Sequence, residues 1–74
     1  MKPSIGRIVI FHLGDGDDGI NNGSREVAAI VTRVWNDICV NLRLFYDGEG
    51  CPTEWKTSAE LGTQPGQWSW PERV

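Results

Sequence analysis

The stretch that decides the fold is EVAAIVTRVW-ND-ICVNLRLFY, residues 26–46. Its first part is rich in β-branched side chains, which pack well on a pleated surface. Its second part alternates with period two, which indicates a strand with one buried face. We therefore expect a β-hairpin whose second strand turns two sets of side chains to opposite faces: Ile38, Val40, Leu42 and Leu44 toward a core, and Cys39, Asn41, Arg43 and Phe45 outward.

The turn of this hairpin is expected at residues 36–37, Asn-Asp. Both residue types tolerate the positive φ angles that two-residue hairpin turns require. A turn of this length places Trp35 opposite Ile38. It also places Arg33 opposite Val40, so the turn predicts the register of the two strands.

Three further strands are expected, at residues 5–13, 53–61 and 67–70, separated by segments rich in Gly, Pro, Asn and Asp. Trp68 and Trp70 stand two positions apart, so in a strand they face the same side. Short strands between such turns are typical of small barrels and sandwiches. The sequence thus predicts one all-β domain over residues 1–74, a small SH3-like, partly open barrel of about five short strands.

A chain of 74 residues has little core, because a domain of this size buries only about 60% of its unfolded surface. One His and two Cys do not supply the ligands of a structural zinc site, which takes about four. Cys39 and Cys51 could form one bridge but are interpreted as reduced thiols of a cytosolic protein. We expect no metal and no cofactor, and we expect tight packing and homo-oligomerisation to supply the remaining stability.

The chain carries ten acidic and seven basic residues, a net charge of −3. This balance argues against binding long nucleic acid, where neutralising phosphates dominates the affinity. It leaves room for a small anionic ligand, which a few placed arginines can hold. No secretion signal is apparent, and no apolar run approaches the roughly 20 residues of a transmembrane helix, so we expect an intracellular protein with no membrane partner.

The loop at residues 14–24 invites comparison with a calcium loop. Asp15, Asp17 and Glu26 match the first, third and twelfth ligand positions of an EF-hand. Gly19 and Ile20 occupy positions where that motif needs a ligand and a glycine. We therefore interpret the segment as a solvated acidic loop.

Catalytic groups are sparse. His12 could act with Ser58 or Ser69, but neither serine lies in a G-x-S-x-G turn. Nothing near Cys51 would lower the pKa of a thiol. We expect no catalytic residues and no enzymatic activity.

The aromatic and arginine residues are the better candidates for a site. A base that stacks on Trp while arginines hold its phosphates is an ordinary mode of nucleotide recognition. The alternative is that the tryptophans fill the barrel and cover its ends. The candidate ligand-binding residues are Arg33, Trp35, Arg43, Phe45, Trp55, Trp68 and Trp70.

Several segments together resemble a family of small proteins encoded by tailed bacteriophages and prophages. They are PSIGRIV at 3–9, AAIVTRVW at 28–35, VNL at 40–42, WKTS at 55–58 and PGQWSWPERV at 65–74. That family carries P-S-x-G-R-I-V-H-Y, A-A-I-V and G-T-W-H-W-P-E segments. Here Ile10-Phe11 replaces the family's His-Tyr, and Ser69 replaces the His between the last tryptophans. The resemblance implies a phage setting and a compact β fold, without an activity.

Three functions are compatible with these observations. The first is a non-enzymatic phage protein that binds a small ligand, in its sharpest form an anti-defence sponge that sequesters a nucleotide immune signal in the host bacterial cytoplasm. The alternative is an SH3-like interaction module that binds a host or phage protein. The third is a structural component of the virion or its assembly.

Overall fold

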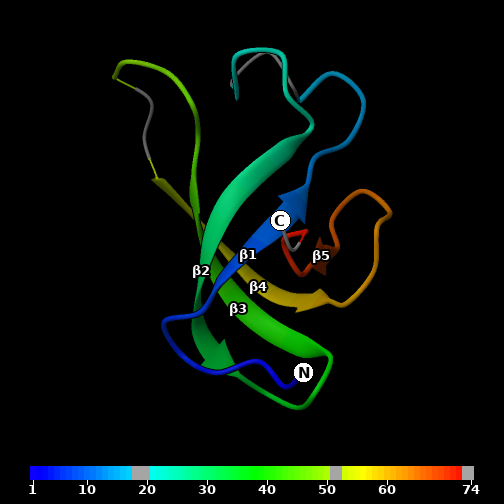
Figure 1. Cartoon of the computed structure of the whole chain (residues 1–74). Helices are drawn as coiled ribbons and strands as arrows, with labels where there is room; N and C mark the ends of the chain where they lie inside the picture. Colours follow the sequence, from blue (N-terminus) through cyan, green and yellow to red (C-terminus); the bar gives the residue numbers. More distant parts are fainter. Residues whose placement is uncertain (18–20, 51–52, 73–74) are drawn as a thin grey trace.

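The computed structural model describes residues 1–17, 21–50 and 53–72, and within them the chain is all-β (Figure 1). The strands lie close to the segments expected from the sequence. They are β1 (Ile8–His12), β2 (Glu26–Val34), β3 (Cys39–Phe45), β4 (Thr53–Glu60) and β5 (Trp68–Ser69). The described residues contain no α-helix, and the expected fold class is confirmed.

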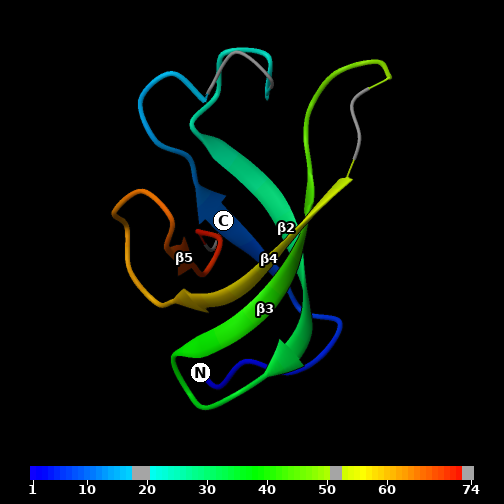
Figure 2. The same ribbon diagram turned by 180° about the vertical axis from the view of Figure 1, so that it is seen from behind.

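The five strands form one antiparallel sheet in the order β4-β3-β2-β1-β5. The sheet curls into a half-barrel of SH3-like form, and β4 comes round toward β5 at its carboxyl end (Figures 1 and 2). There Leu61 forms a parallel bridge with Trp68, and the Gly62 amide donates to the Trp68 carbonyl at 2.8 Å. The first residues of β4 lie away from β5 (Figure 2). The barrel is therefore joined at one end and open at the other.

The core consists of inward-facing residues of all five strands and of Leu13, which follows β1. Val40, Leu42 and Leu44 of β3 are fully buried, as the alternation predicts. Trp68 is also fully buried, and its indole N–H donates to the carbonyl of Ile38 at 3.0 Å. The remaining members are Val9, Phe11, Leu13, Val27, Ala29, Val31 and Ala59.

The expectation that Ile38 joins this core is wrong, because its side chain is 48% exposed. The hairpin connection is longer than two residues. The amide of Trp35 donates to the carbonyl of Cys39 at 2.9 Å, and the Asn36 side-chain oxygen accepts from the amides of Ile38 and Cys39, each at 2.9 Å. Asn36 thus closes the loop locally, as Asx turns do, and leaves Ile38 in the loop.

The predicted register is wrong near the loop for the same reason. Arg33 pairs with Asn41, not with Val40, and Val34 takes the place opposite Val40. The register shifts between Val31 and Arg33, where a β-bulge adds one residue to β2. On the other side of the bulge, residues 28–31 have the partners that a two-residue turn would give them.

Candidate ligand-binding face

One face of the sheet points away from the core, and all five strands contribute to it. The pairing aligns one residue from each of β1, β2, β3 and β4 in a row, Ile8, Ile30, Arg43 and Trp55. A neighbouring row consists of Ser69, Ile10, Ala28, Phe45 and Thr53. We call this surface the outer face, and it includes these two rows together with Arg33 and Trp35 near the hairpin loop.

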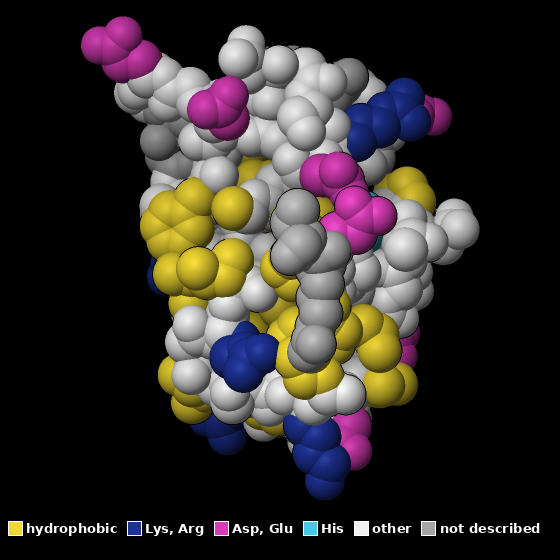
Figure 3. Space-filling model, viewed as in Figure 1, with side chains coloured by type: hydrophobic (Ala, Val, Ile, Leu, Met, Phe, Trp, Pro, Cys, Tyr) yellow, Lys and Arg dark blue, Asp and Glu magenta, His cyan; other side chains and the backbone are white. Residues whose placement is uncertain are grey.

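The outer face exposes much apolar surface. Ile8 is 60% exposed, Trp35 and Trp55 are each 51% exposed, and Phe45 is 43% exposed. Figure 3 shows hydrophobic side chains spread over the middle and lower part of the face in view, with most Lys and Arg side chains among and below them and Asp and Glu side chains mainly above. Exposed apolar patches of this kind commonly mark sites of interaction.

Two arginines stand on this apolar face. Arg43 lies between Ile30 and Trp55 in its row, and the guanidinium of Arg33 lies 4.4 Å from the ring centroid of Trp35. The ion pairs among the described residues are Arg25–Asp15 and Lys56–Glu54, so neither outer-face arginine has a carboxylate partner within that part of the chain. An anionic group can therefore approach both arginines without displacing a carboxylate.

Asn41 holds Trp35 in place, a role that the sequence does not reveal. The Asn41 side chain is nearly buried, and its carbonyl oxygen accepts three hydrogen bonds. The donors are the indole N–H of Trp35 at 2.9 Å, the hydroxyl of Thr57 at 3.1 Å and the amide of Ser58 at 2.8 Å. Because Arg33 stacks on Trp35, Asn41 also fixes the arginine indirectly.

A second β-bulge explains how three donors reach one oxygen. Between the pairs Val40–Ala59 and Leu42–Lys56, β4 has one residue more than β3. Ser58 adopts a positive φ of 55° there, which turns its amide toward Asn41. An asparagine amid an apolar strand is unfavourable by propensity, and this is the sequence signal that could have drawn attention to Asn41.

The structure brings together on the outer face five of the seven candidate ligand-binding residues, Arg33, Trp35, Arg43, Phe45 and Trp55. Trp68 and Trp70 are packing residues, which agrees with the alternative interpretation that the tryptophans fill the barrel. Trp68 belongs to the core, and Trp70 is half-buried against it, with ring centroids 5.2 Å apart in a T-shaped arrangement. The guanidinium of Arg7 lies 5.5 Å from the Trp70 ring centroid. β5 ends at Ser69, so Trp70 lies one residue beyond the strand in which both tryptophans were expected.

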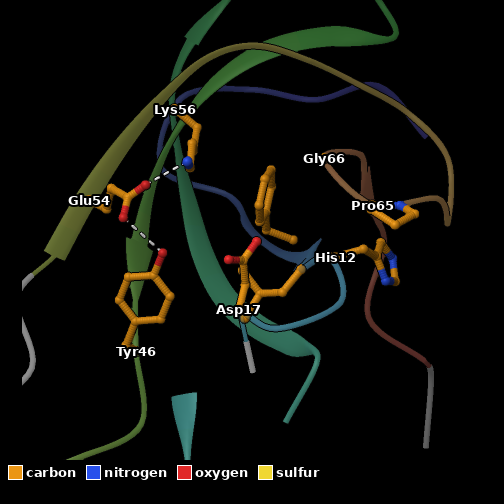
Figure 4. A pocket seen from close by; sticks show the side chains of 10 residues that line it. His12, Asp17, Tyr46, Glu54, Lys56, Pro65 and Gly66 are labelled. Atoms are coloured by element: carbon orange, nitrogen blue, oxygen red, sulfur yellow. Dashed lines mark hydrogen bonds and ion pairs between the residues drawn. The ribbon is translucent and has the colours of Figure 1, made fainter. Parts of the chain in front are cut away.

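A cleft of about 300 Å³ lies on the opposite, inner side, at the open end of the barrel (Figure 4). The core residues Phe11 and Leu13 line it together with Asp17, Pro65 and Gly66. The wall on the β3–β4 side carries a hydrogen-bonded array in which the Tyr46 hydroxyl donates to one oxygen of Glu54 at 3.0 Å and the Lys56 ammonium pairs with the other.

The array perturbs two of its groups. The hydrogen bond from Lys56 and then that from Tyr46 hold the pKa of Glu54 below its usual value. Burial, with the hydrogen bond to Glu54, raises the pKa of Tyr46 to about 12. The phenol is therefore a neutral donor near pH 7 and the carboxyl is ionised.

His12 and Ser69 are also brought together, as the catalytic hypothesis would require. His12 Nε2 lies 2.7 Å from Ser69 Oγ. The pair borders a second depression, lined in part by Glu26, Trp70 and Glu72. No hydrogen bond joins the other ring nitrogen of His12 to a carboxylate within residues 1–17, 21–50 and 53–72.

The remaining sequence hypotheses concern metals and thiols. Asp15 forms an ion pair with Arg25 at 2.7 Å, and no group of three or more potential ligands is positioned to hold a metal ion among the described residues. Gly19 and Ile20 of the compared calcium loop lie outside those residues. Cys39 is half-buried, and Cys51, its possible disulfide partner, also lies outside them.

Comparison of the chain with known protein families, with curated proteins and with solved structures gives no match. Over its described residues the structure has no helix long and apolar enough to cross a membrane.

Proposed function

We propose that this protein is a non-enzymatic binding protein that captures a small nucleotide-type ligand on the outer face. One observation carries the proposal. Arg33 and Arg43, which form no ion pair within the described residues, stand among half-exposed aromatic rings in a chain whose net charge is negative. Such positive charge on an apolar surface suits a ligand that is both anionic and flat.

The binding mode follows from these residue types. A base can stack on an indole ring, and each such stack contributes about 1–3 kcal/mol. Trp55 is the available platform beside Arg43, while Trp35 is held by Asn41 and covered in part by Arg33. The planar guanidinium groups match phosphate oxygens with paired hydrogen bonds. The ligand would therefore lie along the row of Trp55 and Arg43, with its phosphates toward Arg33.

A homo-oligomer completes this site. A ligand stacked on an open face keeps its other side in water, whereas two outer faces brought together would enclose it. The same association would cover Ile8, Phe45 and Trp55, which are exposed in one copy. We propose that ligand capture takes place between protomers.

The setting comes from the resemblance to small phage proteins. In that setting a protein that only binds can act as a sponge, because it removes a nucleotide signal of host defence by stoichiometric capture. No catalytic group is needed for this role. The place of action would be the host bacterial cytoplasm, where such signals are made.

The test is a thermal melt of the purified protein with a panel of cyclic and ADP-ribose-type nucleotides. A true ligand at a hundredfold excess over its Kd should stabilise the fold by about 2.7 kcal/mol. In a domain of this size that corresponds to a rise in Tm of roughly 11–22 °C. The ligand recovered after heating should be chemically unchanged.

Two arginine variants make the test specific. Arg43→Gln should abolish the stabilisation by nucleotide, whereas Arg25→Gln should leave it intact, because Arg25 pairs with Asp15 away from the outer face. The absence of a shift with every nucleotide, or equal effects of the two variants, would eliminate capture on the outer face. Light scattering should find at least a dimer, and a monomer in the presence of ligand would refute the shared site.

A protein partner is the alternative occupant of the same face, since exposed aromatics with arginine are enriched in protein interfaces. If no nucleotide binds, a pull-down from host lysate with wild type and with Trp55→Ala decides the matter. A host protein retained only by the wild type would establish the interaction module, and an empty pull-down would refute it.

A further inference from the structure

The inner cleft has a free strand edge beside it. β4 is the last strand of the sheet, and among the described residues it pairs along its length only with β3. Beyond β4, Leu61 forms a bridge with Trp68, but the first half of the strand has no second neighbour in the part of the chain that the structure describes. Glu54 and Lys56 of this half line the cleft. An incoming strand could therefore take the vacant place beside β4 and direct side chains into the cleft.

The lining of the cleft defines what kind of side chain fits. Two carboxylates, Asp17 and Glu54, face the space against one ammonium, that of Lys56. Both oxygens of Glu54 are already engaged by Lys56 and Tyr46, whereas Asp17 makes no ion pair among the described residues. In Figure 4 the Asp17 carboxylate points into the same space as the Tyr46 hydroxyl. One added positive charge would balance the cleft.

The shape of the cleft also suits a basic side chain. Phe11 and Leu13 belong to the core and give the cleft an apolar floor. A volume of about 300 Å³ is at the small end of ligand pockets. The aliphatic stem of a lysine or arginine packs on apolar surface while its charged head stays in a polar environment, which matches this combination of floor and walls.

We propose that the cleft is a docking site for an extended segment of a partner protein that carries basic side chains at alternate positions. The segment adds to the free edge of β4 as a further strand, a common mode of peptide recognition. One basic side chain enters the cleft, with its stem on Phe11 and Leu13 and its charge beside Asp17. Because the cleft lies on the inner side, this site is independent of nucleotide capture on the outer face.

The experiment measures fluorescence anisotropy of labelled peptides with the full chain at physiological ionic strength. The probe is a short peptide of alternating valine and lysine. One control peptide has glutamate for each lysine. Another keeps the lysines but has proline for each valine, which removes the backbone donors that a strand needs. Only the valine-lysine peptide should bind, and binding should shift the amide resonances of β4.

Matched variants separate docking from general attraction to an acidic protein. Asp17→Asn should weaken binding of the valine-lysine peptide about tenfold or more, since it removes the charge partner of the lysine. Asp37→Asn makes the same chemical change in the exposed hairpin loop and should alter the affinity less than about twofold.

Three results would each overturn the proposal. They are no binding at millimolar peptide, equal weakening by the two variants, and binding of the proline or glutamate peptide as tight as that of the valine-lysine peptide.

Discussion

Replacing Asn41 with leucine tests the most connected polar group of the sheet. Leucine has the same branched shape, although it is larger, and it has no acceptor, so the three donors that meet Asn41 Oδ1 lose their partner. Trp35 and Thr57 are exposed and can turn their donors to water. The amide of Ser58 is fixed by the bulge and aimed at a nearly buried side chain. An unsatisfied group of this kind costs about 1–3 kcal/mol, and the two weakened side-chain bonds together cost about 1 kcal/mol more.

We therefore expect Asn41→Leu to lower the free energy of unfolding by about 2–4 kcal/mol. A chain of 74 residues has a total of roughly 4–11 kcal/mol, so the loss is a large fraction. Urea unfolding followed by tryptophan fluorescence measures it. Thr57→Val should cost up to about 1 kcal/mol in the wild type and almost nothing in Asn41→Leu, because both changes break the same bond. A loss below about 1 kcal/mol, or additive effects of the two changes, would refute the reasoning.

Three further predictions concern single side chains. Ser58→Gly should stabilise the fold by about 0.5–1 kcal/mol in urea unfolding because glycine relieves the positive φ, whereas Ser58→Ala should not stabilise it. Tyr46, the single tyrosine, should ionise with a midpoint near 12 in its ultraviolet absorbance. Because the pKa of Tyr46 is raised on folding, the phenol keeps its proton to higher pH in the folded state than in the unfolded state. Its contribution to stability is therefore present below about pH 10 and is lost as the pH rises toward 12. Tyr46→Phe should remove that part of the pH dependence of stability. Trp68→Phe should cost about 2–3 kcal/mol by leaving a void and removing the indole hydrogen bond to the Ile38 carbonyl, against less than about 1 kcal/mol for Trp55→Phe, and equal costs would contradict the assignment of Trp68 to the core.

The pattern of apolar residues and turns was enough to predict the strands and the part of the core that β3 contributes. Val40, Leu42 and Leu44 face inward because alternate side chains of a strand point to the same side, and this side of β3 covers the core. Ile38 belongs to the same pattern but lies in the loop, because the Asn36 side chain makes a local closure that periodicity does not encode. The register near the loop was unpredictable for the same reason.

The candidate site was predictable where it depends on strand faces. Arg43, Phe45 and Trp55 occupy outward positions of β3 and β4, so alternation places them together once the strands pair. The role of Asn41 depends on a bulge in the neighbouring strand β4, so the pattern of β3 alone does not predict that role. The inner cleft combines residues from both ends of the chain, which only the curl of the sheet brings together.

The bulge in β2 has a consequence for how this surface can change by indels. An extra residue exchanges inward and outward positions for everything beyond it. With the bulge present, Arg33 faces outward and Val34 packs against the core. A deletion of Thr32 alone would restore simple alternation, with Val31 inward, Arg33 outward and Val34 inward as they are now. One lost codon would therefore remove the bulge and still leave Arg33 on the outer face, whereas a deletion of a paired residue elsewhere in β2 would exchange the two faces beyond it.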